Sequence, residues 1–244
     1  MSFAVCIVSA AGGGGSSSLC AALASAFAEK GTKVGVLDCN SGCGELSELL
    51  GASETCVYNA GDAMRGRCGI DEAVCEPFEG VYLVPAANAE QDCQPGSMRR
   101  FGAYFEREEV RRDIIILDMP RAYGTGAEEL YSCADMTVIC CRAEERQLKR
   151  AYRLRRQLQR HETQVRLVIT DFDRKIFSAG TLPDLDKCID IAGARLLGIV
   201  PHDAGFEKAL HSGERIISGE AFEAARRIAG RITGERIALP TSFL

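Results

Sequence analysis

A run of four glycines followed by three serines is the segment of this chain best suited to chemistry. It reads "AAGGGGSSS" over residues 10–18, between a short apolar run and a stretch with helical periodicity. Backbone N–H groups of such a turn can point at one anion, and the N-terminus of the next helix adds partial positive charge. Glycine-rich turns also form for steric reasons alone. The segment indicates either a phosphate-binding loop or a plain strand-to-helix turn, in which Ser16 would cap the helix.

No other group of residues in the sequence predicts an active site. Asp203, Glu207 and His211 fall close together, but their spacing is more typical of the start of a surface helix. We find no Ser/His/Asp set, no pair of carboxylates placed for acid–base chemistry and no supported thiol nucleophile. The glycine run therefore carries the functional prediction.

Twelve cysteines are many for a chain of 244 residues. They form no C-x-x-C pair and no Cys/His cluster with zinc-finger spacing. Several fall in apolar runs, where a free cysteine behaves as a small hydrophobic residue. We expect reduced, structural cysteines, as in a reducing cytosol, with an iron–sulfur site shared across a dimer as the alternative.

Charge and hydropathy argue against several classes of protein. The net charge of -5 argues against general affinity for nucleic acid. No apolar run approaches the ~18–20 residues that cross a bilayer. The first residues, "MSFAVCIVSA", begin an apolar strand at once and lack the basic region of a signal peptide. The composition predicts a cytoplasmic protein.

Short apolar runs rich in valine and isoleucine alternate with segments of helical periodicity. Runs such as "DIIILD" and "MTVICC" are typical of strands buried on both faces of a parallel sheet. We expect strands at Phe3–Ser9, Lys33–Asp38, Val81–Ala86, Asp113–Met119, Met136–Arg142, Val165–Asp171 and Arg195–Val200. We expect helices at Ser17–Lys30, Cys43–Leu50, Arg99–Glu109, Ala143–Arg160, Leu182–Ile191 and Glu220–Ile232, and a long surface loop at Ala87–Ser97. This order predicts one α/β domain over residues 1–244, a doubly wound and mostly parallel sheet with helices on both faces.

The glycine run and its neighbours resemble the MinD/ParA family of deviant P-loop ATPases, whose loop reads K-G-G-x-G-K-[ST]. The similarity begins at "VCIVSAAGGGGSSSLCAALASAF" and continues through "GVLDCN", where the family has D-x-D. It passes through "RRDIIILDMP", at the Walker B position, and "ADMTVICCRAEERQLKRAYRL" to "RLLGIVPHDAGFEKALHSGERI". The resemblance covers nearly the whole chain and implies a P-loop NTPase-like fold with a site for ATP or ADP and Mg²⁺.

The resemblance also marks positions where this chain departs from the family. The lysine that reaches across a dimer to the partner's nucleotide falls at Ala11, and the lysine that holds the β- and γ-phosphates falls at Ser16. The aspartate implicated in handling the attacking water falls at Asn40. An Asn-Arg pair that often reads adenine is replaced by Thr170 and Asp171. The catalytic positions are therefore degenerate.

The scaffold of the family's site is retained. The resemblance implies that the loop would hold phosphates, that Pro201 would flank the base, and that Ser17, Asp38 and Asp118 would serve Mg²⁺. The implied nucleotide-binding residues are Gly12, Gly13, Gly14, Gly15, Ser16, Ser17, Ser18 and Pro201.

Losing both lysines removes fixed positive charge from the place where phosphoryl transfer is stabilised. A hydrogen bond to a charged group contributes about 1.5–3 kcal/mol, so nucleotide binding should weaken by about one to two orders of magnitude. Three alternatives stay open: a plain turn, a weak nucleotide site without efficient hydrolysis, and an ATP-driven dimerisation switch. We expect a regulatory or interaction protein of cell division or spatial organisation that does not hydrolyse ATP efficiently.

The expected helix at residues 143–160 carries a basic stripe over about a third of its circumference. The apolar residues Leu148, Ala151, Leu154 and Leu158 lie towards the other side. The basic residues are Arg142, Arg146, Lys149, Arg150, Arg153, Arg156 and Arg160. A solvated outer face is the simpler interpretation, and a docking surface for a protein partner is the alternative.

The end of the chain does not predict a membrane anchor. Relatives in the family end in a basic amphipathic helix, whereas "GERIALPTSFL" contains Pro240 and has no cationic face. We expect no sequence-specific binding of nucleic acid, and peripheral association with the inner membrane only through a partner. The resemblance leaves a homodimer open.

Overall fold

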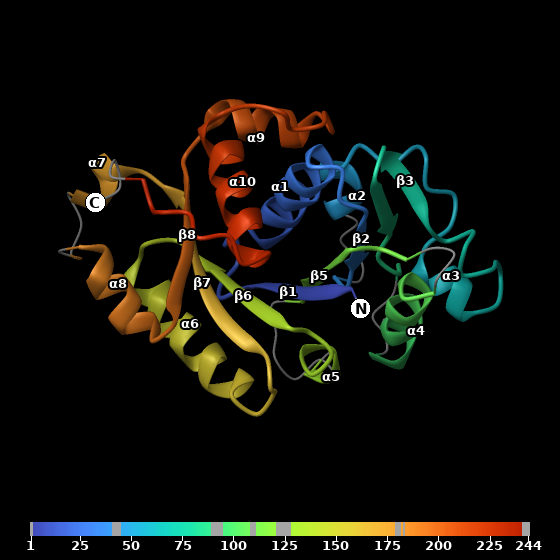
Figure 1. The fold of residues 1–244 in the computed structure, drawn as a ribbon, viewed down its shortest axis with the longest axis horizontal. Helices are drawn as coiled ribbons and strands as arrows, with labels where there is room; N and C mark the ends of the chain where they lie inside the picture. The colour runs from blue at the N-terminus through green and yellow to red at the C-terminus, as the bar shows by residue number, and fades with distance from the viewer. Residues whose placement is uncertain are drawn as a thin grey trace.

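One mixed sheet organises the chain. The computed structural model describes residues 2–40, 45–88, 95–107, 111–120, 128–178, 182 and 184–240. Its strands are β1 (Phe3–Ser9), β2 (Val34–Asp38), β3 (Cys75–Phe78), β4 (Val81–Val84), β5 (Ile114–Met119), β6 (Met136–Cys141), β7 (Gln164–Phe172) and β8 (Arg195–Pro201). They lie in the order β3-β4-β2-β5-β1-β6-β7-β8, and all neighbours run parallel except β3 and β4. The sheet is the predicted one (Figure 1).

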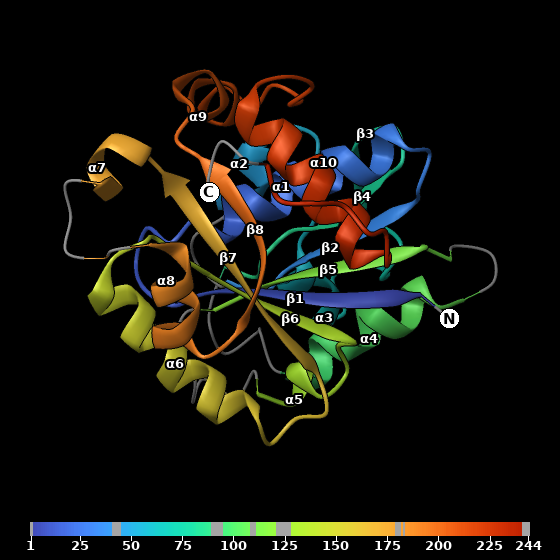
Figure 2. The ribbon, with the colours of Figure 1, turned by 60° about the vertical axis from the view of Figure 1, so that its left-hand side comes forward.

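Helices cover both faces of this sheet (Figures 1 and 2). One face carries α1 (Ser16–Glu29), α2 (Glu45–Leu49), α9 (Ala204–His211) and α10 (Glu220–Ile232). The other carries α3 (Ala60–Met64), α4 (Pro95–Phe105), α5 (Glu128–Tyr131), α6 (Glu145–Leu158) and α8 (Leu185–Ala192). A further short helix, α7 (Arg174–Ser178), follows β7. The predicted doubly wound α/β fold is confirmed.

The sheet is buried because its central strands have few polar residues. Every residue of β5 and β6 is buried, as the runs "DIIILD" and "MTVICC" predict. Helix α1 is rich in alanine, which lets it pack closely between the sheet and α10. One cluster of buried side chains lies on each side of the sheet, and Phe27, Phe222, Phe101 and Phe105 are among the largest.

The seven predicted strands are all present, with ends within two residues of the expected ones. The short strand β3 and the short helices α3, α5 and α7 were not predicted, because four or five residues are too few to show periodicity. Helix α4 begins at Pro95, so the end of the expected loop at Ala87–Ser97 is helical instead. Proline fits the first turn of a helix, which needs no N–H donor there. Residues 89–94 of that loop, and the expected helix start at Cys43, lie outside the described residues.

The expectation that the cysteines are reduced is wrong for one pair. Cys56 and Cys75 form a disulfide, with their Cα atoms 5.5 Å apart. It joins the turn after α2 to strand β3, which pairs antiparallel with β4. The buried free cysteines include Cys6, Cys20, Cys140, Cys141 and Cys188. Burial raises the pKa of Cys141 to about 12, which keeps it an unreactive thiol.

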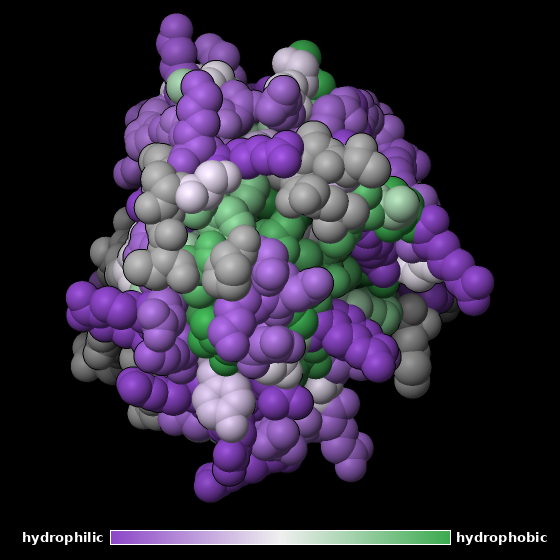
Figure 3. All heavy atoms as spheres, turned by 90° about the vertical axis from the view of Figure 1, so that its left-hand side faces the viewer, coloured by the Kyte–Doolittle hydropathy of each residue, from purple (hydrophilic) through white to green (hydrophobic). Residues whose placement is uncertain are grey.

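One face of the molecule is mainly hydrophilic (Figure 3). The end of the molecule that carries α7 and α8 has polar residues around a central apolar area (Figure 3). Among the described helices, none combines the length and the apolar character that crossing a membrane requires.

Candidate functional site

The glycine run forms a loop between β1 and α1 that is fixed to two other strands. The Ala10 N–H donates to the Cys140 carbonyl on β6 at 2.9 Å. The Thr170 hydroxyl on β7 donates to the Gly14 carbonyl at 2.9 Å. Gly13 and Gly15 have left-handed backbones, with φ of 68° and 76°. The loop is therefore a turn whose backbone is fixed by hydrogen bonds at the carboxyl edge of the sheet.

Gly14 is needed for a different reason, namely close packing. A Cβ atom at this position would lie 1.9 Å from the Ser9 hydroxyl and 3.1 Å from the Ala11 carbonyl oxygen. The Gly14 N–H donates to that same Ala11 carbonyl at 3.1 Å, which closes the turn. Ala11 itself is buried, at 8% exposed.

The helix after the loop starts without a side-chain cap. Gly15 is the N-cap of α1, and Ser16 is already its first helical residue, so the expected capping role of Ser16 is wrong. Ser16 and Ser17 are both buried, while Ser18 is half-buried. The first N–H groups of α1 therefore have no side-chain acceptor, which suits an anion there.

Two buried carboxylates face this helix start from neighbouring strands. Asp38 and Asp118 are register partners on β2 and β5, and each is 1% exposed. Burial raises the pKa of Asp38 to about 8, with the nearby charge of Asp118 adding to the rise. Burial likewise raises the pKa of Asp118 to about 6, against the opposing effect of the Ser17 hydroxyl. Both groups resist ionisation.

The carboxylate of Asp118 is unsatisfied. Within the described residues, neither of its oxygens has a well-formed hydrogen bond. Asp38 accepts the Asn40 N–H at 2.9 Å, and the Asn40 side-chain amide donates to the Asp118 backbone carbonyl at 3.3 Å. Buried unsatisfied oxygens next to serine hydroxyls are the hard donors that Mg²⁺ prefers. The residues present therefore fit a divalent cation.

A small cavity of about 100 Å³ lies over the loop. Its described lining is Ser9, Gly13, Gly14, Gly15, Ser16, Ser17, Ser18, Asn40 and Glu45. No lysine, arginine or histidine belongs to that lining, and Glu45 adds a carboxylate. The backbone of the cavity suits a phosphate, whereas its side chains supply no positive charge.

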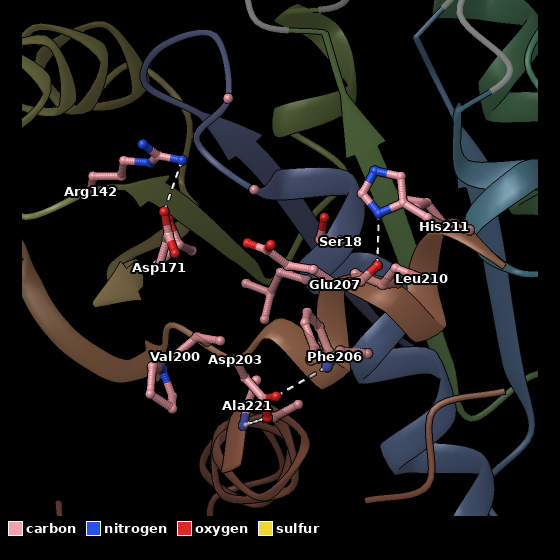
Figure 4. A pocket seen from close by; sticks show the side chains of 18 of the residues that line it. Ser18, Arg142, Asp171, Val200, Asp203, Phe206, Glu207, Leu210, His211 and Ala221 are labelled. Carbon is pink, nitrogen blue, oxygen red and sulfur yellow. Dashed lines mark hydrogen bonds and ion pairs between the residues drawn. The ribbon is translucent and has the colours of Figure 1, made fainter. Parts of the chain in front are cut away.

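A larger cavity of about 320 Å³ opens from the same loop (Figure 4). Val200, Pro201, Phe206 and Leu210 give it an apolar wall, and it shares Gly13, Gly15, Ser18 and Glu45 with the small cavity. A flat apolar ring linked to a phosphate would fit the two cavities together. Pro201, for which the resemblance implies a place beside the base, is part of this apolar wall. Gly12 is exposed and lines neither cavity.

Polar residues gather at one side of the larger cavity. Arg142, just after β6, forms an ion pair of 2.8 Å with Asp171 on β7. Asp171 has a left-handed backbone with φ of 51°, uncommon for a residue other than glycine. Its other oxygen lies 2.7 Å from Nδ1 of His202. Hydrogen bonding to Asp171 raises the pKa of His202.

Asp203 is at the start of helix α9, Glu207 lies in its first turn and His211 is its last residue. All three residues also line the larger cavity. Asp203 is the N-cap of α9 and accepts the Phe206 N–H at 3.1 Å. It also accepts the Ala221 N–H at 3.2 Å, which ties α9 to the start of α10. Asp203 is therefore a structural residue in the cavity wall.

Helix α6 has the predicted two faces. Leu148, Ala151, Leu154 and Leu158 are buried against the sheet and α8. The basic residues of the stripe are all exposed. Of these, Arg142 pairs with Asp171, and Lys149 pairs with Glu145 at 2.6 Å.

Sequence reasoning missed three residues of the site. Glu45 follows the expected D-x-D strand end, Thr170 closes the loop, and His202 follows Pro201 directly. Thr170 lies near the end of a predicted strand, whereas Glu45 and His202 follow the ends of predicted strands. The carboxyl ends of parallel strands meet at one edge of a sheet, where ligand sites of α/β folds lie.

Comparison with known proteins gives the fold and the family of this chain. The MinD of Bacillus subtilis (strain 168) is 28% identical over 249 residues, covering 98% of this chain and 92% of the relative. The fold is similar to the MinC:MinD cell division protein complex of Aquifex aeolicus, with a TM-score of 0.84, 24% identity, and coverage of 98% and 99%. It is also similar to MinD complexed with Mg-ADP from Pyrococcus horikoshii OT3, with a TM-score of 0.82, 19% identity, and coverage of 96% and 97%. Residues 5–216 match the family model of the CobQ/CobB/MinD/ParA nucleotide binding domain. The chain therefore belongs to the CobQ/CobB/MinD/ParA family, with MinD proteins among its relatives.

Proposed function

We propose that this protein is a MinD-like regulatory or interaction protein of cell division or spatial organisation. In this proposal its single domain binds ATP or ADP weakly and does not hydrolyse ATP efficiently. The observation that carries the proposal is the charge of the small cavity, whose described lining has Glu45 and no cationic side chain. Stabilising a transferring phosphoryl group depends mainly on fixed positive charge.

The remaining residues would still hold a nucleotide. The loop from Gly12 to Gly15, with Ser16 and Ser18, would bind phosphate through backbone N–H groups and hydroxyls. Ser17, Asp38 and Asp118 would hold Mg²⁺, which supplies positive charge next to the phosphates when bound. Burial raises the pKa values of both carboxyl groups, Asp38 and Asp118, and both must ionise before they can hold the cation.

Three positions that are charged in the family, two lysines and one aspartate, carry uncharged residues here. Ala11 is packed against the end of β1, and Ser16 lies in the first turn of α1. Asn40 donates its amide to a backbone carbonyl and has no acidic group to orient a water molecule. These three positions support binding without turnover.

The proposed partner is a protein that docks on the basic face of α6. A homodimer and peripheral membrane association through that partner are part of the same proposal, as is a cytoplasmic location. The solved complex of a MinD with MinC supports a protein partner for this fold.

A nucleotide titration and a turnover assay test the proposal. We expect MgATP to bind the full chain one to two orders of magnitude more weakly than the same chain carrying Ser16→Lys, and release of phosphate to stay at background. Low-micromolar binding of MgATP with phosphate release by the unaltered chain would instead establish an ATP-driven dimerisation switch.

Restoring the lysines gives a matched control. The Ser16 hydroxyl is close enough to Asp118 to lower the pKa of that carboxyl, so the ammonium of Ser16→Lys would have a buried carboxylate nearby and the variant should fold. We expect Ala11→Lys with Ser16→Lys to recover tight MgATP binding, and Asp118→Asn in that background to weaken it again. Failure of the restored variant to bind would favour the plain-turn interpretation.

A further inference from the structure

Three side chains from three separate elements meet beside the larger cavity. They are Asp171 on β7, His202 just after β8, and Glu207 on α9. Nδ1 of His202 lies 2.7 Å from Oδ1 of Asp171 and 3.8 Å from Oε1 of Glu207. One ligand atom from each residue falls within 4.8 Å of the other two. In Figure 4, Glu207 and Asp171 both lie at the polar side of this cavity.

The backbone holds these residues together. The His202 N–H donates to the Phe172 carbonyl at 3.0 Å, which extends the pairing of β7 and β8 beyond Pro201. Glu207 lies in the first turn of α9, where its N–H donates to the Asp203 carbonyl at 3.0 Å. Asp203 caps that helix and so fixes where its first turn begins, which sets the position of Glu207. The arrangement results from sheet register and helix capping.

Arg142 orients the first of these ligands. Its guanidinium pairs with Oδ2 of Asp171 at 2.8 Å and leaves Oδ1 facing His202. Carboxylates that bind metals are commonly fixed by a hydrogen bond to their second oxygen. With neutral imidazole, two carboxylates and one guanidinium give a net charge of about −1, which a divalent cation would reverse to about +1.

We propose that Asp171, His202 and Glu207 form a binding site for a divalent transition metal ion, Zn²⁺ by the chemistry of the donors. One imidazole nitrogen and two carboxylate oxygens are a donor set that Zn²⁺ takes at ~2.0–2.2 Å. Ligand atoms at that radius lie ~3–3.5 Å apart, so the observed spacings need only small rotations of the side chains. The ion would take the place of the proton between His202 and Asp171, and its remaining positions would face water and the cavity.

This proposal does not depend on nucleotide binding. The metal ligands lie on β7, just after β8 and on α9, whereas the residues proposed for Mg²⁺ lie on α1, β2 and β5. Zn²⁺ can therefore be titrated in the absence of any nucleotide, and its failure to bind would leave the proposed function unaffected.

Calorimetric titration of the full chain with ZnCl₂ tests the site. We expect one ion per chain, and at least tenfold weaker binding in both His202→Ala and Asp171→Asn. The matched control is His211→Ala, because His211 lies in the wall of the same cavity but its Nδ1 bonds to the backbone carbonyl of Glu207 at 2.7 Å. That variant should bind Zn²⁺ like the unaltered chain, and all variants should show unaltered circular dichroism.

Cobalt spectroscopy separates this site from the free cysteines. Co²⁺ held by nitrogen and oxygen gives weak visible bands, and thiolate ligands add a strong near-ultraviolet band. We expect the weak bands alone, and their loss in His202→Ala. A thiolate band, equal Zn²⁺ affinity in His202→Ala, or no saturable binding would overturn the proposal.

Discussion

At the scale of single residues, the packing around Gly14 and the buried carboxylates Asp38 and Asp118 determine what the glycine loop can bind. Gly14 leaves no room for a side chain, because the Ser9 hydroxyl and the Ala11 carbonyl occupy that space. Asp38 and Asp118 lie below, buried and adjacent, and no positive side chain is among the described residues that line the small cavity above them. The loop backbone is thus fixed by packing. The two buried carboxylates have no cationic side chain in the described lining of the small cavity.

Gly14→Ala should destabilise the fold. The added methyl group overpacks the end of β1, at a cost of about 1–3 kcal/mol in the free energy of unfolding, measured by urea denaturation. Gly102→Ala on α4 is the control, because no atom lies within 4 Å of its added Cβ, and it should be neutral or slightly stabilising. Ser9→Ala should rescue part of the loss in Gly14→Ala. Equal stability of the two alanine variants would show that the loop relaxes freely.

The buried carboxylates make stability depend on pH. Their folded pKa values, about 8 for Asp38 and about 6 for Asp118, lie above the unfolded value near 3.9. The folded chain therefore holds more protons than the unfolded chain in this window. Their contribution is fully present below about pH 4, and it is lost as the pH rises to about 8.

We expect the free energy of unfolding to fall between pH 4 and pH 8, by up to about 1.4 kcal/mol per pH unit for each proton involved. Asp38→Asn should flatten the upper part of this slope, from about pH 6 to 8, because it removes the group with the higher pKa. Asp113→Asn, at an exposed carboxylate before β5, is the surface variant for comparison. An unaltered slope in Asp38→Asn would contradict this account.

At the scale of elements, helix α6 has one apolar face that packs in the core and one basic face that is exposed to solvent. Its apolar side chains are buried against the sheet, and its cationic side chains project into solvent. Only Lys149 and Arg142 of the basic stripe are in described salt bridges. Exposed ion pairs contribute little to stability, so the basic face does not stabilise the fold.

Leu154→Ala should cost about 2–5 kcal/mol in the free energy of unfolding, because it leaves a cavity between α6 and the sheet. Its neighbour Arg153 is exposed, and Arg153→Ala should change stability by about 0.5 kcal/mol or less. Both are measured by denaturant titration. Similar losses in the two variants would mean that the faces of α6 are not divided in this way.

Charge on the same helix can be tested through binding. We expect the triple variant Arg146→Glu, Lys149→Glu, Arg153→Glu to lose affinity for a labelled glutamate-rich peptide at low salt. The same three positions changed to glutamine should give an intermediate affinity and normal stability. A peptide that binds the reversed helix as well as the unaltered one would exclude α6 as a docking surface for an acidic partner.

At the scale of the whole molecule, one disulfide connects parts that the sheet alone holds loosely. Strand β3 is the edge of the sheet and pairs only with β4. The Cys56–Cys75 bond closes a segment of chain between α2 and that edge, with a sequence separation of 19. The bond therefore limits the freedom of this segment in the unfolded chain.

Removing that bond should lower stability. We expect Cys75→Ser to reduce the free energy of unfolding by about 2–4 kcal/mol relative to the oxidised chain. Dithiothreitol should bring the unaltered chain to the same value. Cys133→Ser, at an exposed free cysteine, should have no such effect. A reductant without influence on the unfolding midpoint would show that the bond does not form in solution.

Local patterns in the sequence were enough to predict most of the fold. Continuous runs of valine and isoleucine marked seven strands, and the apolar stripe of α6 marked its buried face, because hydrophobic periodicity is written in consecutive residues. The short helices α3, α5 and α7 and the edge strand β3 were not predicted, since tertiary contacts rather than propensity hold them. The disulfide also escaped, because cysteine spacing does not reveal which pairs the fold brings together.

The sequence by itself determined the fold class, the family and the loop of glycines that lacks lysine. Only the tertiary structure decided which atoms meet at that loop. It made Gly14 a packing residue, placed Ser16 inside α1 rather than at its cap, and brought Glu45 to the cavity. It also brought Asp171, His202 and Glu207 together at the ends of β7 and β8 and the start of α9. The reason is physical, because parallel strands far apart in the chain end at one edge of the sheet. The charge at that edge is the sum of side chains that follow several different strands.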